Sequence, residues 1–166
     1  MSRAEALAEL EELGVYGAQV YLLDVVPAIA MCWADGRAQV DEQEEIWEFM
    51  TAHVDRINQL AGFPVISHVE ARAFVDRFLR VRPSPARLKR MIELLPAVSL
   101  SSSDSSWVRE RQQAMLEACL DVAGAALSPK PRHAADFYSD EEKELYRELS
   151  GLLSPADGGI STVVRR

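Results

Sequence analysis

Residues 30–50 read AMCWADGRAQVDEQEEIWEFM, and this stretch decides the class of fold. An apolar run ends at Asp35-Gly36, and four residues later an acidic cluster opens a segment with apolar side chains every three or four residues. Glycine takes the left-handed backbone that commonly ends a helix. Acidic residues are favoured where a helix begins because its N-terminus carries partial positive charge. The stretch therefore predicts a helix, a corner and a second helix.

The rest of the chain carries the same start and stop signals. Ser2 and Ser67 are each followed three residues later by glutamate, and Ser84 is followed directly by proline, so all three predict helix starts. Pro27, inside the apolar run, predicts either a kink or a helix that begins near Asp24. The predicted helices cover about residues 2–13, 18–34, 41–61, 67–80, a segment from 84, 106–127 and 139–153. Strand patterns are nearly absent, so we predict an all-α bundle of about seven helices.

The acidic helix start at residues 41–50, DEQEEIWEFM, aligns without gaps with DEEKELYREL at residues 140–149. Each copy follows an apolar helix that ends near a glycine, Gly36 or Gly124. This self-similarity predicts two related helix-turn-helix units packed against each other. Chance is the alternative, because acidic helix starts are common. We predict one domain over residues 1–153 and a flexible C-terminal tail over 154–166.

Composition narrows the class of protein. The 18 Lys and Arg residues against 26 Asp and Glu give a net charge of −8, which opposes binding to nucleic acid. Cys32 and Cys119 both lie in apolar runs and are predicted to be buried free thiols of a reducing compartment. The longest apolar stretch contains Asp24 and Pro27 and is too short to span a bilayer. We expect a cytoplasmic protein without a transmembrane segment.

The acidic corner has two interpretations. An EF-hand is excluded because Met31 and Trp33 would occupy ligand positions and have no oxygen to offer. Helix capping accounts for part of the pattern, with Asp41 as the N-cap, Glu44 three residues on and Val40 tucked under the corner. Capping leaves unexplained why a carboxylate, Asp35, stands at the negative end of a helix.

The pattern of Ala-Asp-Gly, then an aliphatic residue and an acid-rich helix start resembles the repeated motif of the tellurite-resistance TerB-like proteins. The resemblance covers about residues 18–153. It implies an all-α fold with two helix-turn-helix repeats and a cytoplasmic bacterial protein in metal or oxyanion stress response. It also implies acidic residues that bind a divalent cation, and no established enzymatic activity.

Matching by position places the candidate metal site at the corner. Asp35 matches the aspartate of the family motif and Val40 its aliphatic residue. The family glutamate corresponds to Glu44 by the capping register, or to Glu45 by the internal repeat. The second repeat has Ala123 where the aspartate should stand, so only the first half keeps the site. These residues do not distinguish calcium, magnesium, manganese and zinc.

A basic run follows the acidic corner, with one acid, Asp76, among seven basic residues. The candidate partner-binding residues are Arg72, Arg77, Arg80, Arg82, Arg87, Lys89 and Arg90. In one interpretation they pair with the acidic helix starts at 41–48 or 140–148, within the chain or in a homodimer. In the other they dock an acidic protein partner or contact an anionic membrane surface.

Signatures of catalysis are missing from the sequence. None of the three histidines, His53, His68 and His133, has a glutamate three residues before it, as a di-metal helix bundle requires. Neither cysteine lies in a nucleophile signature, and there is no phosphate-binding glycine loop. We therefore predict no enzymatic activity. The expected function is a cation-binding TerB-like module, and the alternative is a protein–protein adaptor that docks through charged faces without metal.

Overall fold

The computed structural model describes residues 1–100, 103–125 and 138–153. Within these ranges the chain forms helices and no strand, which confirms the all-α class. The elements are α1 (Arg3–Glu12), a 3-10 helix η1 (Gly17–Val25), α2 (Val26–Cys32), α3 (Val40–Ala61), α4 (His68–Arg80), α5 (Pro85–Glu93), α6 (Leu95–Val98), α7 (Ser105–Gly124) and α8 (Asp140–Leu153). Seven of these α-helices are longer than the single turn of α6, as predicted. The predicted tail and the predicted end of α7 at residue 127 lie outside the described residues.

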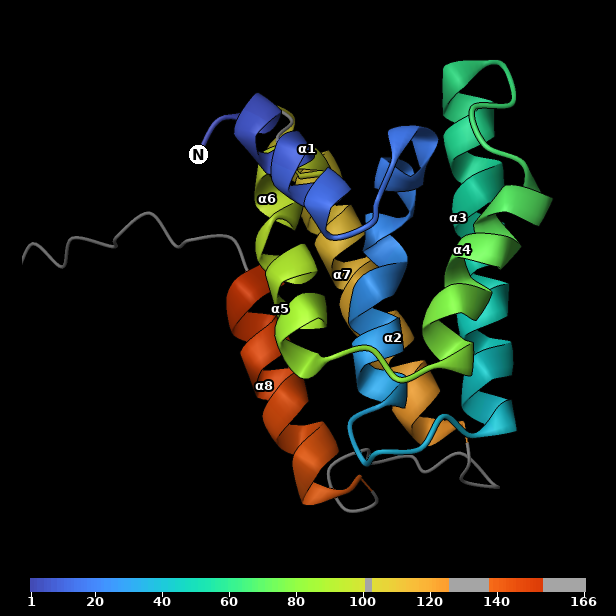
Figure 1. Cartoon of the computed structure of the whole chain (residues 1–166), viewed down its shortest axis with the longest axis vertical. Coiled ribbons are helices and arrows are strands. Elements are labelled where there is room, and N and C mark those ends of the chain that lie inside the picture. Colours follow the sequence, from blue (N-terminus) through green and yellow to red (C-terminus); the bar gives the residue numbers. More distant parts are fainter. Residues whose placement is uncertain (101–102, 126–137, 154–166) are drawn as a thin grey trace, which may run out of the picture.

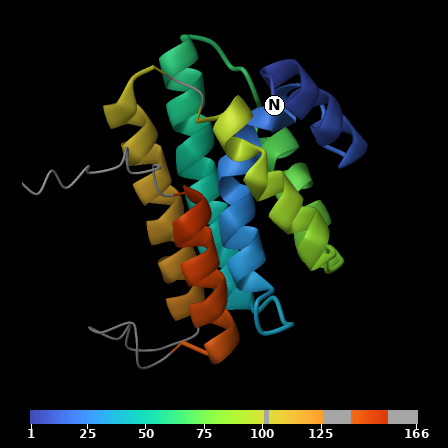
Figure 2. The same ribbon diagram turned by 90° about the vertical axis from the view of Figure 1, so that its left-hand side faces the viewer.

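Helix α2 is the centre of the bundle (Figures 1 and 2). All of its residues are buried, and it contacts α3, α4, α5, α7 and α8. Helices α3 and α4 lie on one side of it, α5 and α8 lie on the other, and α1 packs across one end beside α6 (Figure 1). One cluster of buried apolar side chains runs from α1 to α8.

The apolar run that contains Pro27 changes helix type instead of kinking. Residues Gly17–Val25 form η1, and α2 begins at Val26 with Pro27 in its first turn. Proline suits that place because the first turn of a helix does not use its backbone N–H groups. This confirms the prediction of a helix that begins near Asp24. Gly36, with φ of +89°, then turns the chain out of α2 in the left-handed conformation.

Helix α3 buries the predicted stripe only in its first half. Ile46, Met50 and Val54 are buried, whereas Ile57 is half-buried and Ala61 is exposed. Gly62 ends the helix in the left-handed conformation that favours glycine. The second half of α3 is less covered because a pocket opens beside it.

The start of α3 differs from the prediction by two residues. The N-cap is Gln39, whose backbone N–H donates to Glu42 Oε2 at 2.8 Å, so Asp41 and Glu44 do not form the predicted capping pair. Val40 is exposed and does not pack under the corner. Glu42 takes the capping role because its side chain turns inward and is buried, whereas Glu44 is exposed.

The two acidic helix starts, at α3 and α8, are capped by the same kind of hydrogen bond. In α8 the backbone N–H of Ser139 donates to Glu142 Oε2 at 2.7 Å, so Glu142 matches Glu42 in role. The ungapped match had paired Glu42 with Glu141, one residue away. Buried Leu149 of α8 still follows the ungapped match to Met50 of α3. The duplication itself stays a prediction.

Candidate functional site

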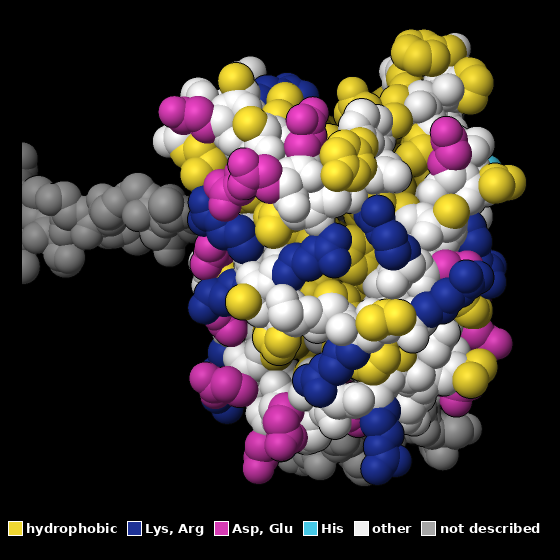
Figure 3. Space-filling model, in the orientation of Figure 1, with side chains coloured by type: hydrophobic (Ala, Val, Ile, Leu, Met, Phe, Trp, Pro, Cys, Tyr) yellow, Lys and Arg dark blue, Asp and Glu magenta, His cyan; other side chains and the backbone are white. Residues whose placement is uncertain are grey.

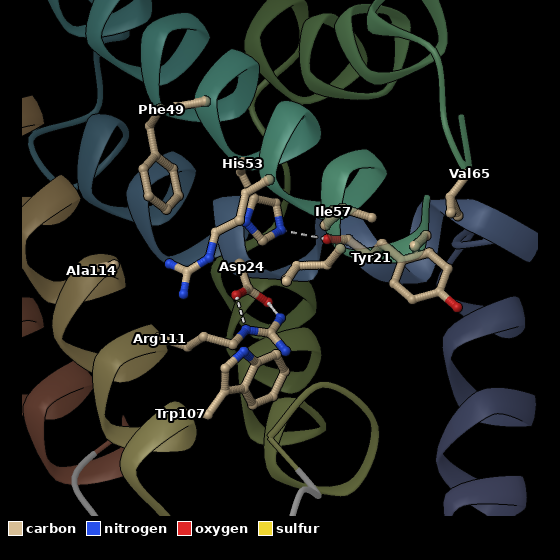
Figure 4. Close-up of a pocket in the computed structure, with 13 residues that line it drawn as sticks. Tyr21, Asp24, Phe49, His53, Ile57, Val65, Trp107, Arg111 and Ala114 are labelled. Atoms are coloured by element: carbon tan, nitrogen blue, oxygen red, sulfur yellow. Dashed lines mark hydrogen bonds and ion pairs between the residues drawn. The ribbon is translucent and has the colours of Figure 1, made fainter. Parts of the chain in front are cut away.

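A cavity of about 480 Å³ lies between η1, α3 and α7 (Figure 4). Its walls are mainly apolar and consist largely of aromatic and aliphatic side chains. The apolar lining includes Phe49, Ile57, Leu60, Val65, Trp107 and Ala114. Cavities of this size and character commonly hold small molecules in proteins.

A buried ion pair joins η1 to α7 at this cavity. Arg111 donates from Nε to Asp24 Oδ2 at 2.8 Å and from Nη2 to Asp24 Oδ1 at 2.5 Å, while Nη1 donates to the Ser99 carbonyl. Its guanidinium lies over the Trp107 ring at 4.4 Å, and Figure 4 shows the pair beside this ring. Asp24 is 2% exposed, so its charge depends on Arg111 for compensation.

His53 presents a defined ring orientation to the cavity. Its Nε2 lies 2.7 Å from the carbonyl oxygen of Tyr21, and Figure 4 shows the ring pointing at that carbonyl. A carbonyl oxygen can only accept, so the proton is on Nε2. The neutral ring then keeps Nδ1 as its acceptor. Phe49 stacks on the same ring with 6.0 Å between centroids, which fixes its plane.

Arg56 adds positive charge to the lining. Its Nη2 lies 3.0 Å from Glu110 Oε1 in a pair whose side chains are 41% and 64% exposed. Exposed pairs of this kind contribute little to stability, because water screens both charges. Asp24 and Arg111 neutralise each other, and Arg56 is balanced by Glu110, which stands outside the lining of the cavity.

The residues predicted for the cation site lie elsewhere, at the corner between α2 and α3. Asp35 is exposed, and its Oδ1 accepts from the backbone N–H of Arg37 at 3.0 Å. This bond explains a carboxylate at the end of α2, because an aspartate often closes a turn in this way. Glu44 is exposed and Glu45 is half-buried near the start of α3. Among the described residues, no three His, Cys, Asp or Glu side chains group closely enough to hold a metal ion.

Glu42 is the ionisable residue at this corner that the sequence analysis missed. It is 2% exposed, and Cys32 Sγ lies 3.8 Å from its Oε2. Burial raises the pKa of Glu42 to about 7, and the negative charges of Asp35 and Glu142 add to the rise, against the hydrogen bond from Gln39. Glu42 stands three residues after the N-cap Gln39, and this spacing is the sequence feature that could have indicated its capping role.

Both cysteines are buried free thiols, as predicted. Burial raises the pKa of each, so both stay protonated at neutral pH. Cys32 faces Glu42, and Cys119 packs in the core of α7. Neither has the lowered pKa of a nucleophilic cysteine.

Several of the predicted partner-binding residues stabilise the fold. Arg77 Nη2 donates to the Gly14 carbonyl at 2.8 Å, and Arg87 Nε donates to the Leu13 carbonyl at 3.1 Å. These bonds satisfy carbonyl groups at the end of α1, where cations are favoured. Arg90 forms ion pairs with two acids, Glu9 and Glu93.

The other basic residues lie on an exposed surface, and Figure 3 shows Lys and Arg side chains spread across the face formed by α4 and α5. Lys89 pairs with Glu148 at 2.5 Å, which fits the predicted pairing with the acidic helix starts. Arg72 and Arg80 flank Asp76 on α4. Arg82 reaches back to the α2–α3 corner, where its Nη2 lies 3.5 Å from the Trp33 carbonyl.

The sequence-predicted sites and the cavity therefore do not coincide. Neither the corner acids nor the basic run lines the cavity. One feature of the sequence was unusual, because Asp24 is a charge inside an apolar run, but nothing in the sequence marks Arg111, 87 residues later, as its partner.

No family model, no curated protein and no solved structure matches the chain. The TerB-like resemblance thus stays a prediction that rests on the motif at Asp35. No single helix within the described residues is long and apolar enough to cross a membrane, and α1 with the η1–α2 segment reaches that length only as a pair bent by 88°.

Proposed function

We propose that the protein is a non-catalytic binding module whose cavity between η1, α3 and α7 takes a compact apolar molecule with one anionic group. The observation that carries the proposal is the mainly apolar lining beside the Arg56 guanidinium, whose partner Glu110 is exposed and outside the lining, so that a ligand anion can take its place. The aromatic walls formed by Phe49 and Trp107 suit a ring or a branched hydrocarbon. Arg56 suits a carboxylate, sulfonate or phosphate because a guanidinium can donate two parallel hydrogen bonds to such a group.

Binding is favoured over catalysis by the way the polar side chains are engaged. The Asp24 carboxylate is held by Arg111 on both oxygens, and the His53 Nε2 proton is held by the Tyr21 carbonyl. The Asp24 carboxylate is thus committed as an acceptor, and the described lining holds no serine, threonine or cysteine that the remaining Nδ1 of His53 could activate as a nucleophile. These groups are therefore suited to orient a ligand and to keep the shape of the cavity.

The expected ligand preference can be measured with two dyes that share the same rings. Anilinonaphthalene sulfonate carries one anion, and phenylnaphthylamine carries none. We expect the anionic dye to bind at a single site at least about tenfold more tightly, which corresponds to about 1.4 kcal/mol from Arg56. Fluorescence titration of the natively folded chain gives both dissociation constants.

Matched variants make the dye measurement specific to the cavity. Arg56→Gln should bring the two dyes to similar affinity, whereas Arg109→Gln, an exposed arginine of α7, should leave the preference intact. Glu110→Gln frees Arg56 and should strengthen the anionic dye. Ala114→Phe fills the cavity and should weaken both dyes. A preference that survives Arg56→Gln would contradict the proposal.

The TerB-like cation function stays a second prediction and has its own test. If a divalent cation sits at the corner, a concentration about a hundred times its dissociation constant adds about 2.7 kcal/mol to the free energy of unfolding. The melting temperature of the metal-stripped chain would then rise by about 5–10 °C with calcium, magnesium, manganese or zinc. Asp35→Asn keeps the acceptor for the Arg37 N–H and should abolish the rise. No rise with any ion would refute the site.

A further inference from the structure

Helix α4 presents an exposed surface that no other described element covers. We call it the α4 face and define it by Val69, Arg72, Ala73, Asp76, Arg80 and Val81, which together with Arg77 line a shallow hollow of about 500 Å³. Val69 and Val81, at its two ends, are 79% and 73% exposed. The two exposed valines thus flank a basic centre. A surface of this kind can make apolar contacts at its ends and recognise charge in its middle.

The centre of the α4 face has more positive than negative charge. Asp76 lies between two arginines, with Oδ1 3.5 Å from Arg72 Nε and Oδ2 3.8 Å from Arg80 Nη2. Both distances exceed those of a good hydrogen bond. Asp76 Oδ1 already accepts from Trp47 Nε1 at 3.1 Å. One carboxylate thus shares its charge between two guanidinium groups, and both can form a further bond.

The side chain of Arg72 has a fixed orientation on the α4 face. Its guanidinium lies over the Trp47 ring at 3.7 Å, a stacked arrangement that fixes the plane of the group and limits the entropy lost on binding. Arg77 and Arg87 differ because their guanidinium groups already bond backbone carbonyls at the end of α1. The basic run therefore divides into residues that hold the fold and residues available on the α4 face.

We propose that the α4 face docks an acidic segment of another protein. Carboxylates of that segment pair with Arg72 and Arg80, and its apolar side chains cover Val69 and Val81. The face spans the 13 residues of α4, about 20 Å of helix, which matches a short peptide segment. A protein segment fits better than an anionic membrane, because the net charge of −8 on the chain would be repelled by a broad anionic surface.

The test uses a short fluorescein-labelled peptide in which pairs of glutamates alternate with pairs of leucines. We expect fluorescence anisotropy at low salt to show binding that is about tenfold weaker for the matching glutamine–leucine peptide, since opposite charges supply the specificity. The double variant Arg72→Gln/Arg80→Gln should lose about tenfold in affinity for the acidic peptide. The control Arg109→Gln/Arg147→Gln removes the same charge from exposed sites on α7 and α8 and should keep the affinity.

Each other outcome overturns the proposal. Equal losses in the two double variants would show that net charge, not the α4 face, decides binding. Equal affinity for the two peptides, or no binding of either, would remove the role of charge pairing. Binding to phosphatidylserine vesicles without binding to the acidic peptide would assign the surface to a membrane. Circular dichroism of each variant confirms that the fold is kept, and the result is independent of the cavity ligand.

Discussion

Replacing Arg111 by methionine is expected to lower the free energy of unfolding by about 3–5 kcal/mol, the usual cost of leaving one partner of a buried ion pair uncompensated. The long apolar side chain fills much of the space of the arginine but leaves Asp24 2% exposed without its counter-charge. It also frees the Ser99 carbonyl from its donor. Stabilities of small domains total about 5–15 kcal/mol, so the variant should be severely destabilised.

Urea unfolding of the two single variants and the double variant separates the ion pair from packing. Asp24→Leu alone leaves Arg111 without its counter-charge and should also lower the free energy of unfolding by several kcal/mol. The double variant Asp24→Leu/Arg111→Met removes both charges and should recover much of the loss, because two apolar groups need no compensation. Single variants whose costs simply add in the double variant would show that Asp24 and Arg111 are not coupled.

The second large effect is a dependence of stability on pH that Glu42→Gln removes. The pKa of Glu42 is about 7 in the folded chain against an ordinary value of 4.5. Between these values the folded chain keeps a proton that the unfolded chain has released. The stability that Glu42 contributes is therefore full below about pH 4.5 and is lost as the pH rises through 7. The loss amounts to at most about 3 kcal/mol.

Glutamine keeps an acceptor for the Gln39 N–H but carries no charge. Glu42→Gln should therefore match the parent near pH 4.5 and be more stable than the parent at pH 8, as measured by urea unfolding at each pH. Glu70 is the matched control, since it also stands three residues after an N-cap but is exposed. Hydrogen bonds from Ser67 lower its pKa, so Glu70→Gln should lose stability at neutral pH and less in acid. A Glu42→Gln variant that is less stable than the parent at pH 8 would contradict the account.

The sequence was sufficient where helix boundaries depend on neighbours a few residues apart. The side chains of Ser2, Ser67 and Ser84 each accept from a backbone N–H three residues later, as their spacing predicted. Such caps involve only residues close together in the chain, so they can be predicted from one amino-acid sequence. The end of α3 at about residue 61 was also predicted, because Gly62 takes the left-handed conformation for an equally local reason.

Prediction was wrong at the start of α3 because several acids competed for one capping position. Asp41, Glu42 and Glu44 all stand close enough to a helix start to serve. The choice of Glu42 depends on which side of α3 faces α2 and α7, and this is set by tertiary packing. Glu142 of α8, 100 residues along the chain, contributes to the same buried environment.

The cavity could not be predicted because its polar residues come together only in the folded chain. Asp24 and Arg111 are 87 residues apart, and neither belongs to a short motif. Arg56 and His53 lie on the face of α3 that a simple amphipathic pattern assigns to the edge between core and solvent. A site was predicted at the corner instead, because the residues of the motif at Asp35 are close together in the sequence.

A nitrogen–proton chemical-shift map with anilinonaphthalene sulfonate shows whether the cavity between η1, α3 and α7 is the ligand site. We expect shifts at the indole N–H of Trp107, the side-chain N–H of Arg56 and the backbone of α3 from Phe49 to Ala61, with α4 and α5 unchanged. Shifts confined to the α4 face, or none at the cavity, would contradict this proposal.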